Sequence, residues 1–297
     1  MRIGVVGLGS MGYGIAGSLL RAGHEVVGAD VSPTAVARFQ QDGGATADIH
    51  SLASELDALV IVVLNAVQAE DVLFGAQGLV DELSAACVVT LCVTVSPDYA
   101  RGAAERCAAR GIAFLDAPIS GGSAKAAQGK LSIMASGTAE AFAKARPALD
   151  GMAETVFELG DTAGVGSAMK AVNQMLAGVH IAAMAEAITF GITQGIDPAT
   201  FMTVIPRCAG TSWMLENRAP HIVAGDYTAH SAVDIWPKDL GIVLDAARSA
   251  KFAAPVTAAA LQQFLAASGM GFGREDDAAV AKVYARNTGI VLPGEGD

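Results

Sequence analysis

The first half of the chain alternates short runs of apolar, mostly β-branched residues with longer amphipathic segments. The apolar runs are typical of buried strands and span Arg2–Val6, Glu25–Ala29, Leu59–Leu64, Cys87–Leu91 and Ala113–Leu115. The segments between them are typical of helices and include Tyr13–Ala22, Pro33–Gln41 and Pro97–Arg110. This alternation predicts βαβ units, and therefore a parallel sheet with helices on both faces. Two further strands are predicted at Leu131–Ala135 and Thr155–Leu159, on either side of a helix at Ala139–Leu149.

The pattern changes after Gly160, where strand-like runs stop. Gly164 to Gln194 is typical of one continuous helix, about 45 Å long at 1.5 Å per residue. Such a helix is too long to be a crossover in a compact sheet, so we place it as a spine between two domains. Only helices are predicted further on, at Pro198–Ile205, Ser212–Ile222, Asp234–Ala250, Pro255–Ser268 and Asp276–Arg286. The sequence thus predicts an α/β domain over residues 1–162 and a helical domain over residues 163–297.

Composition narrows the classes of partner and of cellular setting. The 297 residues include 19 basic and 30 acidic side chains, a formal net charge of −11, which argues against binding to nucleic acid. An anionic substrate must then be held by a local cluster of groups. The four cysteines form no CxxC pair, and the chain has no uninterrupted apolar run of about 18 residues. We therefore expect a soluble, cytoplasmic protein with reduced thiols, no metal site and no membrane span.

The run Gly7-Leu8-Gly9-Ser10-Met11-Gly12 has the GxGxxG pattern of dinucleotide-binding loops. It directly follows the first predicted strand and opens the first predicted helix, the context in which the pattern is specific. Gly7 would permit the tight turn, Gly9 the close approach of a pyrophosphate, and Gly12 the packing of the helix on the strand. The alternative is an ordinary strand-turn-helix unit without a ligand.

Asp30 follows the second predicted strand, where a carboxylate accepts hydrogen bonds from the adenosine ribose hydroxyls. A carboxylate at this place repels the additional phosphate of NADP, and the following Val31-Ser32-Pro33 supplies no arginine to hold that phosphate. The sequence therefore favours NAD as the cofactor, the alternative being a surface aspartate with no such role.

A second loop, Asp116 to Gly122, follows the strand at Ala113–Leu115. Loops after strand ends are where open α/β sheets bind ligands. Ser120 followed by Gly121 and Gly122 places a hydroxyl beside exposed backbone N–H groups, which together suit a carboxylate. A plain tight turn is the alternative.

Lys170 lies in a stretch of the long helix rich in Ala, Met and Val. An ammonium is seldom buried without a reason, and desolvation would lower its pKa toward neutrality, as a proton-transferring lysine requires. Asn173 lies on the same helix face, with Gln174 beside it. The alternative is a lysine whose stem packs on the helix while its head stays in water.

Four motifs occur in the order typical of the β-hydroxyacid dehydrogenases: Gly7 to Gly12, Asp116 to Gly122, Lys170-x-x-Asn173 and Lys238-Asp239. The chain resembles this family over essentially its whole length. The family includes 3-hydroxyisobutyrate dehydrogenase and tartronate semialdehyde reductase, and it is related to 6-phosphogluconate dehydrogenase. The resemblance implies a Rossmann-type NAD-binding domain joined by the long helix to an all-helical domain for substrate binding and oligomerisation. It also implies an active site in the cleft between the two domains.

The same resemblance assigns roles to individual residues. Lys170 is the catalytic lysine, Asn173 holds a substrate hydroxyl, and the substrate carboxylate is held by Ser120, Gly121 and Gly122. The nicotinamide end of the cofactor is approached by Thr94 and Lys238, the latter also contacting substrate, and is bordered by Leu64 and Asn65. Two departures stand out, since many members have asparagine at Gln174 and proline at Asn65.

Four segments of the predicted helical domain resemble the L-threonate dehydrogenase branch most, namely Ser212 to Arg218, Gly225 to Tyr227, Ser231 to Ile235 and Gly273 to Asp277. This likeness implies NAD-dependent oxidation of L-threonate at C2 to give 2-oxo-tetronate. Within the family the alternatives are a 3-hydroxyisobutyrate dehydrogenase and a tartronate semialdehyde reductase.

Two further readings come from other functional classes, a non-catalytic nucleotide-binding reader and an imine reductase. The intact Ser120-Gly121-Gly122 loop disfavours the reader, and Lys170 disfavours the imine reductase. The long apolar helix and the Ala-rich helical domain favour a homodimer or homotetramer.

Overall fold

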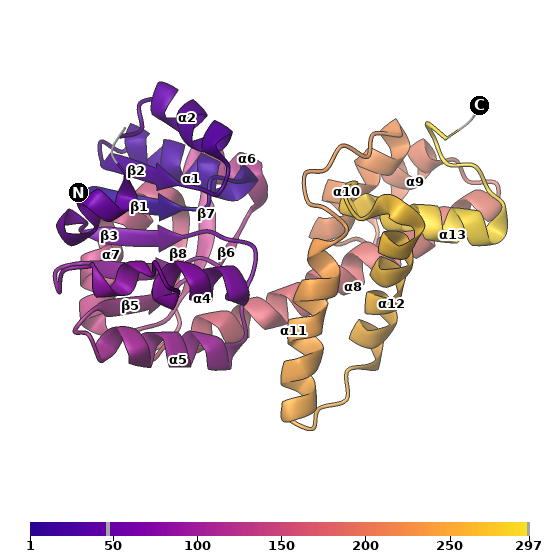
Figure 1. Ribbon diagram of the computed structural model, residues 1–297. Helices are drawn as coiled ribbons and strands as arrows, with labels where there is room; N and C mark the ends of the chain where they lie inside the picture. Colours follow the sequence, from indigo (N-terminus) through magenta and orange to yellow (C-terminus); the bar gives the residue numbers. More distant parts are fainter. Residues whose placement is uncertain (46–47, 296–297) are drawn as a thin grey trace. The chain divides into compact units, whose positions relative to one another are not determined.

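The computed structural model describes residues 1–45 and 48–295, and these form two compact units, Met1–Lys170 and Ala171–Asp297 (Figure 1). The division falls inside helix α8 (Val165–Thr193), which begins in the first unit and continues through the second. The single long helix predicted from Gly164 to Gln194 is therefore confirmed. The boundary between residues 162 and 163 stays a prediction of where the functional domains separate.

The first unit contains a five-stranded sheet in which every neighbouring pair is parallel, as predicted. Its order is β2-β1-β3-β4-β5, with β1 (Arg2–Val6), β2 (Glu25–Ala29), β3 (Ala58–Ile61), β4 (Val88–Leu91) and β5 (Ala113–Asp116). Val6 pairs with both Ala29 and Ile61. Ile61 in turn pairs with Leu91, which pairs with Asp116. The carboxyl ends of all five strands thus share one edge, and the loops that leave it lie side by side.

Helices cover both faces of this sheet, because successive side chains of each strand point to opposite sides. Ile3 and Val5 of β1 belong to a core shared with α1 (Ser10–Arg21), α6 (Gly122–Gln128) and α7 (Ala139–Met152). Val6 belongs to a second core, shared with α4 (Ala66–Phe74) and α5 (Pro97–Ala108). The chain runs from β2 to β3 through α2 (Pro33–Gln41) and the short α3 (Ile49–Leu52).

A second, three-stranded sheet follows β5 along the chain. Its order is β6-β7-β8, with β6 (Ile119–Ser120), β7 (Leu131–Ala135) and β8 (Ala153–Glu158). The predicted runs correspond to β7 and β8, which pair in parallel, whereas β6 is antiparallel to β7 and was not predicted. Two residues are too few to give a periodic signal.

One predicted strand is too long. The run Leu59–Leu64 was expected to be extended throughout, but β3 ends at Ile61. Asn65 accepts a hydrogen bond from the backbone N–H of Gln68 at 2.9 Å and so caps α4, a helix that the predicted alternation requires but whose bounds were not predicted. The cap draws the last residues of the run into the turn before the helix.

The described part of the second unit consists of helices and the loops between them. After α8 come α9 (Pro198–Val204), α10 (Trp213–Ala224), α11 (Ile235–Ser249), α12 (Pro255–Ala267) and α13 (Ala281–Thr288). The expectation of one helix over Asp276–Arg286 is wrong, because a 3₁₀ turn at Asp277–Val280 precedes α13. Asp276 caps this turn by accepting a hydrogen bond from the backbone N–H of Ala278 at 3.1 Å.

Helix α8 is long and apolar enough to cross a membrane, with a mean hydropathy of 1.6 over its most apolar window. Length and composition are weak evidence, because the core helix of a soluble protein passes the same test. Ile181, Ala185 and Ile188 of α8 lie in the apolar core of the second unit, where they contact residues of several other helices. We therefore assign α8 as a core helix of a soluble protein.

Candidate active site

The GxGxxG run forms the turn from β1 into α1, and two of its glycines are sterically required. Gly7 has a φ of +97°, and a Cβ there would lie 2.4 Å from the carbonyl oxygen of Val62. A Cβ on Gly12 would lie 1.8 Å from the carbonyl oxygen of Gly7. At Gly9, by contrast, a Cβ would meet nothing within 4 Å. The glycines thus close the turn tightly on the protein side and leave its outer side open.

The start of α1 is open to an anion. Gly9 is the N-cap residue of the helix, and among the described residues no side chain caps its first N–H groups. Gly9 and Ser10 are exposed and Met11 is half-buried, while Leu8 is packed into the core. Uncapped N–H groups at a helix N-terminus bind phosphate well. This turn therefore fits the pyrophosphate of a dinucleotide.

Asp30 lies just beyond β2 and is tied to the same turn. Its Oδ2 accepts a hydrogen bond from the backbone N–H of Leu8 at 2.6 Å, and its Oδ1 accepts one from Ser32 at 2.8 Å. A carboxylate oxygen can accept more than one hydrogen bond, so both oxygens keep capacity for ribose hydroxyls. The structure thus brings the predicted phosphate loop and the predicted ribose ligand together.

The loops after β3 and β4 carry the other predicted cofactor residues. Leu64 is exposed, and its backbone N–H donates to Gln68 Oε1 at 2.9 Å. Asn65 caps α4 through its side-chain oxygen. Thr94 is half-buried beyond β4. All three lie on loops that leave the carboxyl edge of the sheet.

Ser120, Gly121 and Gly122 form the turn between β6 and α6. Gly121 has a φ of +136° and Gly122 a φ of +76°, conformations in which any other side chain would be strained. Ser120 and Gly121 are half-buried and Gly122 is exposed. The glycines are therefore needed to shape this loop.

Asp116, the last residue of β5, is fully buried and holds the start of α8. Its Oδ2 accepts hydrogen bonds from the backbone N–H groups of Gly164 and Ser167, at 2.9 and 2.8 Å. Its Oδ1 accepts one from Ser167 Oγ at 2.7 Å. Burial raises the pKa of the Asp116 carboxyl, and these hydrogen bonds offset part of that effect. The sequence placed Asp116 in a motif without predicting this contact.

Lys170 lies one turn further along α8 and is 8% exposed. Its Nζ donates a hydrogen bond to the carbonyl oxygen of Ile119 at 2.8 Å. The amine therefore lies beside the peptide group that joins Ile119 to Ser120. The alternative of a lysine with a solvated head is therefore wrong, because the side chain is buried.

A row of polar contacts in the second unit joins four residues of two motifs. Asn173 Nδ2 donates to Gln174 Oε1 at 2.9 Å, and Gln174 Nε2 donates to Asp239 Oδ2 at 2.5 Å. Lys238 Nζ lies 2.5 Å from Asp239 Oδ1. Asp239 is 2% exposed, whereas a Lys-Asp pair at a helix start usually faces solvent. The sequence named Asp239 only as part of the Lys238-Asp239 motif, and its burial and its contact with Gln174, 65 positions away, give no local signal.

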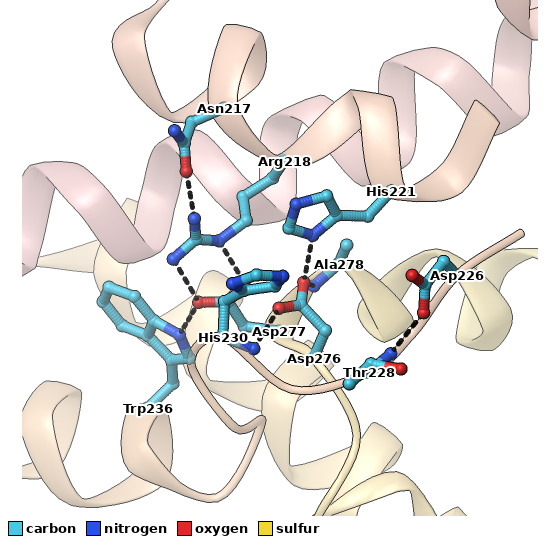
Figure 2. A network of polar contacts seen from close by, with 10 residues as sticks. All are labelled: Asn217, Arg218, His221, Asp226, Thr228, His230, Trp236, Asp276, Asp277 and Ala278. Atoms are coloured by element: carbon cyan, nitrogen blue, oxygen red, sulfur yellow. Dashed lines mark hydrogen bonds and ion pairs between the residues drawn. The ribbon is translucent and has the colours of Figure 1, made fainter. Parts of the chain in front are cut away.

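A second polar network of this unit joins α10, α11 and the 3₁₀ turn (Figure 2). Arg218 Nε donates to Asp277 Oδ1 at 2.5 Å, and Trp236 Nε1 donates to Asp277 Oδ2 at 2.9 Å. His221 Nδ1 lies 2.9 Å from Asp276 Oδ1, whose other oxygen accepts the backbone N–H of His230. Arg218, Asp276 and Asp277 come from the segments that resemble the L-threonate dehydrogenase branch, whereas His221, His230 and Trp236 lie just outside them.

The pKa values of the two adjacent carboxyls of this network, Asp276 and Asp277, are shifted in opposite directions. Burial opposes ionisation of Asp276, but hydrogen bonds from His221 and from the backbone of His230 and Ala278 hold its pKa below the usual range. Burial raises the pKa of Asp277, and the guanidinium of Arg218 offsets part of that rise.

Two known families match successive parts of the chain. Residues 2–160 match the family described as the NAD binding domain of 6-phosphogluconate dehydrogenase. Residues 164–284 match the family described as NAD-binding of NADP-dependent 3-hydroxyisobutyrate dehydrogenase.

Individual relatives match over most of their length. An L-threonate dehydrogenase from Cupriavidus necator is 49% identical over 296 residues, 99% of each chain. A 3-hydroxyisobutyrate dehydrogenase from Pseudomonas aeruginosa is 36% identical over 270 residues, 88% of this chain and 90% of the relative. The crystal structure of a 3-hydroxyisobutyrate dehydrogenase from Salmonella typhimurium is 45% identical, with a TM-score of 0.89, and the match covers 95% of this chain and 99% of that one.

Proposed function

Because the chain belongs to the β-hydroxyacid dehydrogenase family, to which 3-hydroxyisobutyrate dehydrogenase also belongs, we propose that it oxidises L-threonate to 2-oxo-tetronate with NAD. As a member of that family it is an enzyme, a hydroxyacid dehydrogenase with an NAD-binding domain. The finer assignment to L-threonate is supported by the higher identity to L-threonate dehydrogenases. The observation that carries the proposed chemistry is the buried amine of Lys170 beside Ser120.

Lys170 is the proposed general acid and base. When bound, the cofactor supplies the hydride acceptor at C4 of its nicotinamide. In its uncharged form, Lys170 accepts the proton of the substrate hydroxyl at Nζ while the C–H bond breaks, and in the reverse direction the ammonium returns that proton. Its hydrogen bond to the carbonyl oxygen of Ile119 holds Nζ beside the peptide group that leads into Ser120.

The substrate is held at two ends in this proposal. Ser120 and the N–H groups of Gly121 and Gly122 bind the carboxylate, and Asn173 binds a hydroxyl group. Fixing both ends of the substrate aims one of its C–H bonds at the nicotinamide. Alignment of this kind contributes several kcal/mol to catalysis. Lys238 remains a proposed ligand of substrate and cofactor on the strength of the resemblance.

NAD is the proposed cofactor in preference to NADP. The N–H groups of the turn from Gly7 to Gly12 fit the pyrophosphate, and Asp30 fits the ribose hydroxyls. Two backbone groups hold Asp30 in place, so its charge stays where the additional phosphate of NADP would lie. Leu64, Asn65 and Thr94 are the proposed contacts nearer the nicotinamide.

The proposed assembly is a homodimer or homotetramer in the cytoplasm. Val165, Met169, Val172 and Leu176 recur at helical spacing along α8 and are 39–53% exposed, a stripe that suits contact between subunits. Cys87, Cys92 and Cys107 are buried free thiols, which suits a reducing compartment. Light scattering on the purified protein measures the number of subunits.

A panel of hydroxy acids tests the proposed function. L-threonate, D-erythronate, D-glycerate and 3-hydroxyisobutyrate are each supplied with NAD or NADP, and the absorbance of the reduced cofactor is followed. We expect the highest kcat/KM for L-threonate with NAD. A higher kcat/KM for 3-hydroxyisobutyrate would support the second candidate function, a 3-hydroxyisobutyrate dehydrogenase, which the similarity to the Pseudomonas aeruginosa relative favours. Absence of turnover with every acid would contradict both.

A further inference from the structure

The row of contacts from Lys238 to Asn173 fixes which way two amide groups face. Asp239, paired with the Lys238 ammonium at 2.5 Å, is a carboxylate and can only accept hydrogen bonds. Gln174 must therefore present Nε2 to Asp239, which leaves Oε1 for its other neighbour. An amide oxygen can also only accept, so Asn173 must present Nδ2 to Gln174. The charge on Asp239 thus determines the orientation of an amide two contacts away.

The helices that carry this row are packed too closely to slide. A Cβ on Gly178, one turn beyond Gln174 in α8, would lie 2.9 Å from Leu240 and 3.0 Å from Trp236 of α11. Leu240 directly follows Asp239, so this contact sets the distance that the Gln174 side chain spans. An asparagine at position 174, shorter by one methylene, would not close the 2.5 Å contact to Asp239 on the same backbone.

We propose that Gln174 and Asp239 are positioning residues that hold Asn173 with its Oδ1 turned to the substrate. There Oδ1 accepts a hydrogen bond from a second hydroxyl, on the carbon next to the reacting one. The inference rests on the proposed function, in which Lys170 takes the proton of the reacting hydroxyl. It names the substrate class as acids with vicinal hydroxyl groups. An acid without the second hydroxyl leaves Oδ1 without this hydrogen bond, and a site built to bind a substrate hydroxyl discriminates strongly against an analogue that lacks it.

The test compares L-threonate with its 3-deoxy analogue, 2,4-dihydroxybutanoate of the same configuration at C2. The ratio of their kcat/KM values is measured with NAD for the wild type and for Gln174→Met, which keeps length and removes both hydrogen bonds. Asp239→Asn is the second variant, because an amide there no longer dictates which way Gln174 faces. Gln262→Met, an exposed position on α12, is the matched control.

We expect the preference of the wild type for L-threonate to fall about tenfold or more in Gln174→Met and severalfold in Asp239→Asn. The loss should lie in kcat/KM for L-threonate, with the analogue changed little. General damage to the fold would lower kcat/KM for both substrates by the same factor and leave their ratio unchanged. Gln262→Met should match the wild type.

Two outcomes separate this inference from the proposed function. The inference would be overturned, and the proposed function would stand, if the wild type turns over L-threonate and both Gln174→Met and Asp239→Asn show the same ratio of kcat/KM values as the wild type. No turnover of L-threonate by the wild type would overturn the proposed function and the inference together.

Discussion

The two units build polar sites in different ways. In the first unit the predicted ligand loops are shaped by backbone, through glycines at Gly7, Gly12, Gly121 and Gly122 that no other residue could replace without strain or collision. In the second unit the polar groups are held by pairs of side chains far apart in sequence, such as Gln174 with Asp239 and His221 with Asp276. Backbone shape is local and side-chain pairing is not.

This difference has consequences for stability as well as for prediction. A loop held by glycine geometry depends on a few adjacent residues, whereas a buried ion pair depends on both of its partners. Asp277 is fully buried and the Arg218 side chain is only 12% exposed, so removing either one leaves the charge of the other buried without its partner. The four experiments below probe the contrast, from the largest expected effect to the smallest.

Replacing Arg218 by leucine should destabilise the second unit most. The change leaves the Asp277 carboxylate buried with Trp236 as its remaining side-chain donor, and breaking a buried pair on one side costs about 3–5 kcal/mol. Urea unfolding followed by circular dichroism measures the loss. Arg248→Leu breaks a solvent-exposed pair with Asp245 and is the matched control. Equal losses in the two variants would contradict the account.

Lys170→Ala should lower kcat by about a hundredfold or more, as expected on losing a general acid and base. The affinity for NAD, which depends on the separate turn before α1, should change little. Steady-state kinetics and calorimetric titration with NAD measure the two quantities. Lys130→Ala, at an exposed lysine of the same unit, is the control. Turnover near that of the wild type would remove Lys170 from the mechanism.

Gly12→Ala tests the backbone-built site. The added methyl would lie 1.8 Å from the Gly7 carbonyl oxygen, so we expect weaker binding of NAD and a loss of about 1–3 kcal/mol in stability. Gly17→Ala on the same helix has only the flexible Arg21 side chain nearby, at 3.4 Å, and should stabilise by about 0.5–1 kcal/mol. Losses of equal size at both positions would show that the turn is not specially constrained.

Acid should affect the buried carboxyls of the two units with opposite sign. The pKa of Asp276 is lowered in the folded state, so its contribution to stability is present above the unfolded value of about 3.9 and is lost as the pH falls through the folded value. The pKa of Asp116 is raised, so protonation at low pH relieves a cost of burial.

Thermal melting between neutral and strongly acidic pH distinguishes these two signs. Asp276→Asn should flatten the decline in Tm below about pH 4. Asp116→Asn should not flatten it. A decline as steep in Asp276→Asn as in the wild type would contradict the assignment for Asp276.

The sequence predicted most of what local patterning encodes. Alternating apolar runs predicted the parallel sheet, and the uninterrupted pattern from Gly164 predicted α8. The turn from Gly7 to Gly12 and Asp30 were predicted as one site and do lie together. Each of these features repeats a signal over neighbouring residues.

What the sequence did not predict depends on partners distant along the chain or on very short elements. The hydrogen bond between Ser167 and Asp116 joins residues 51 positions apart, and the one between Gln174 and Asp239 joins residues 65 positions apart. Strand β6 has two residues, too few for a period to show. The Lys238-Asp239 pair resembled a solvated helix start because nothing near it reveals that Asp239 is buried.

Transfer of an isotope from substrate to cofactor tests the central claim most directly. The wild-type enzyme is given L-threonate carrying deuterium at C2 together with NAD, and the reduced cofactor is analysed by mass spectrometry and NMR. The account predicts one deuterium at C4 of the nicotinamide and slower turnover than with unlabelled substrate. Reduced cofactor without deuterium, or none formed at all, would contradict it.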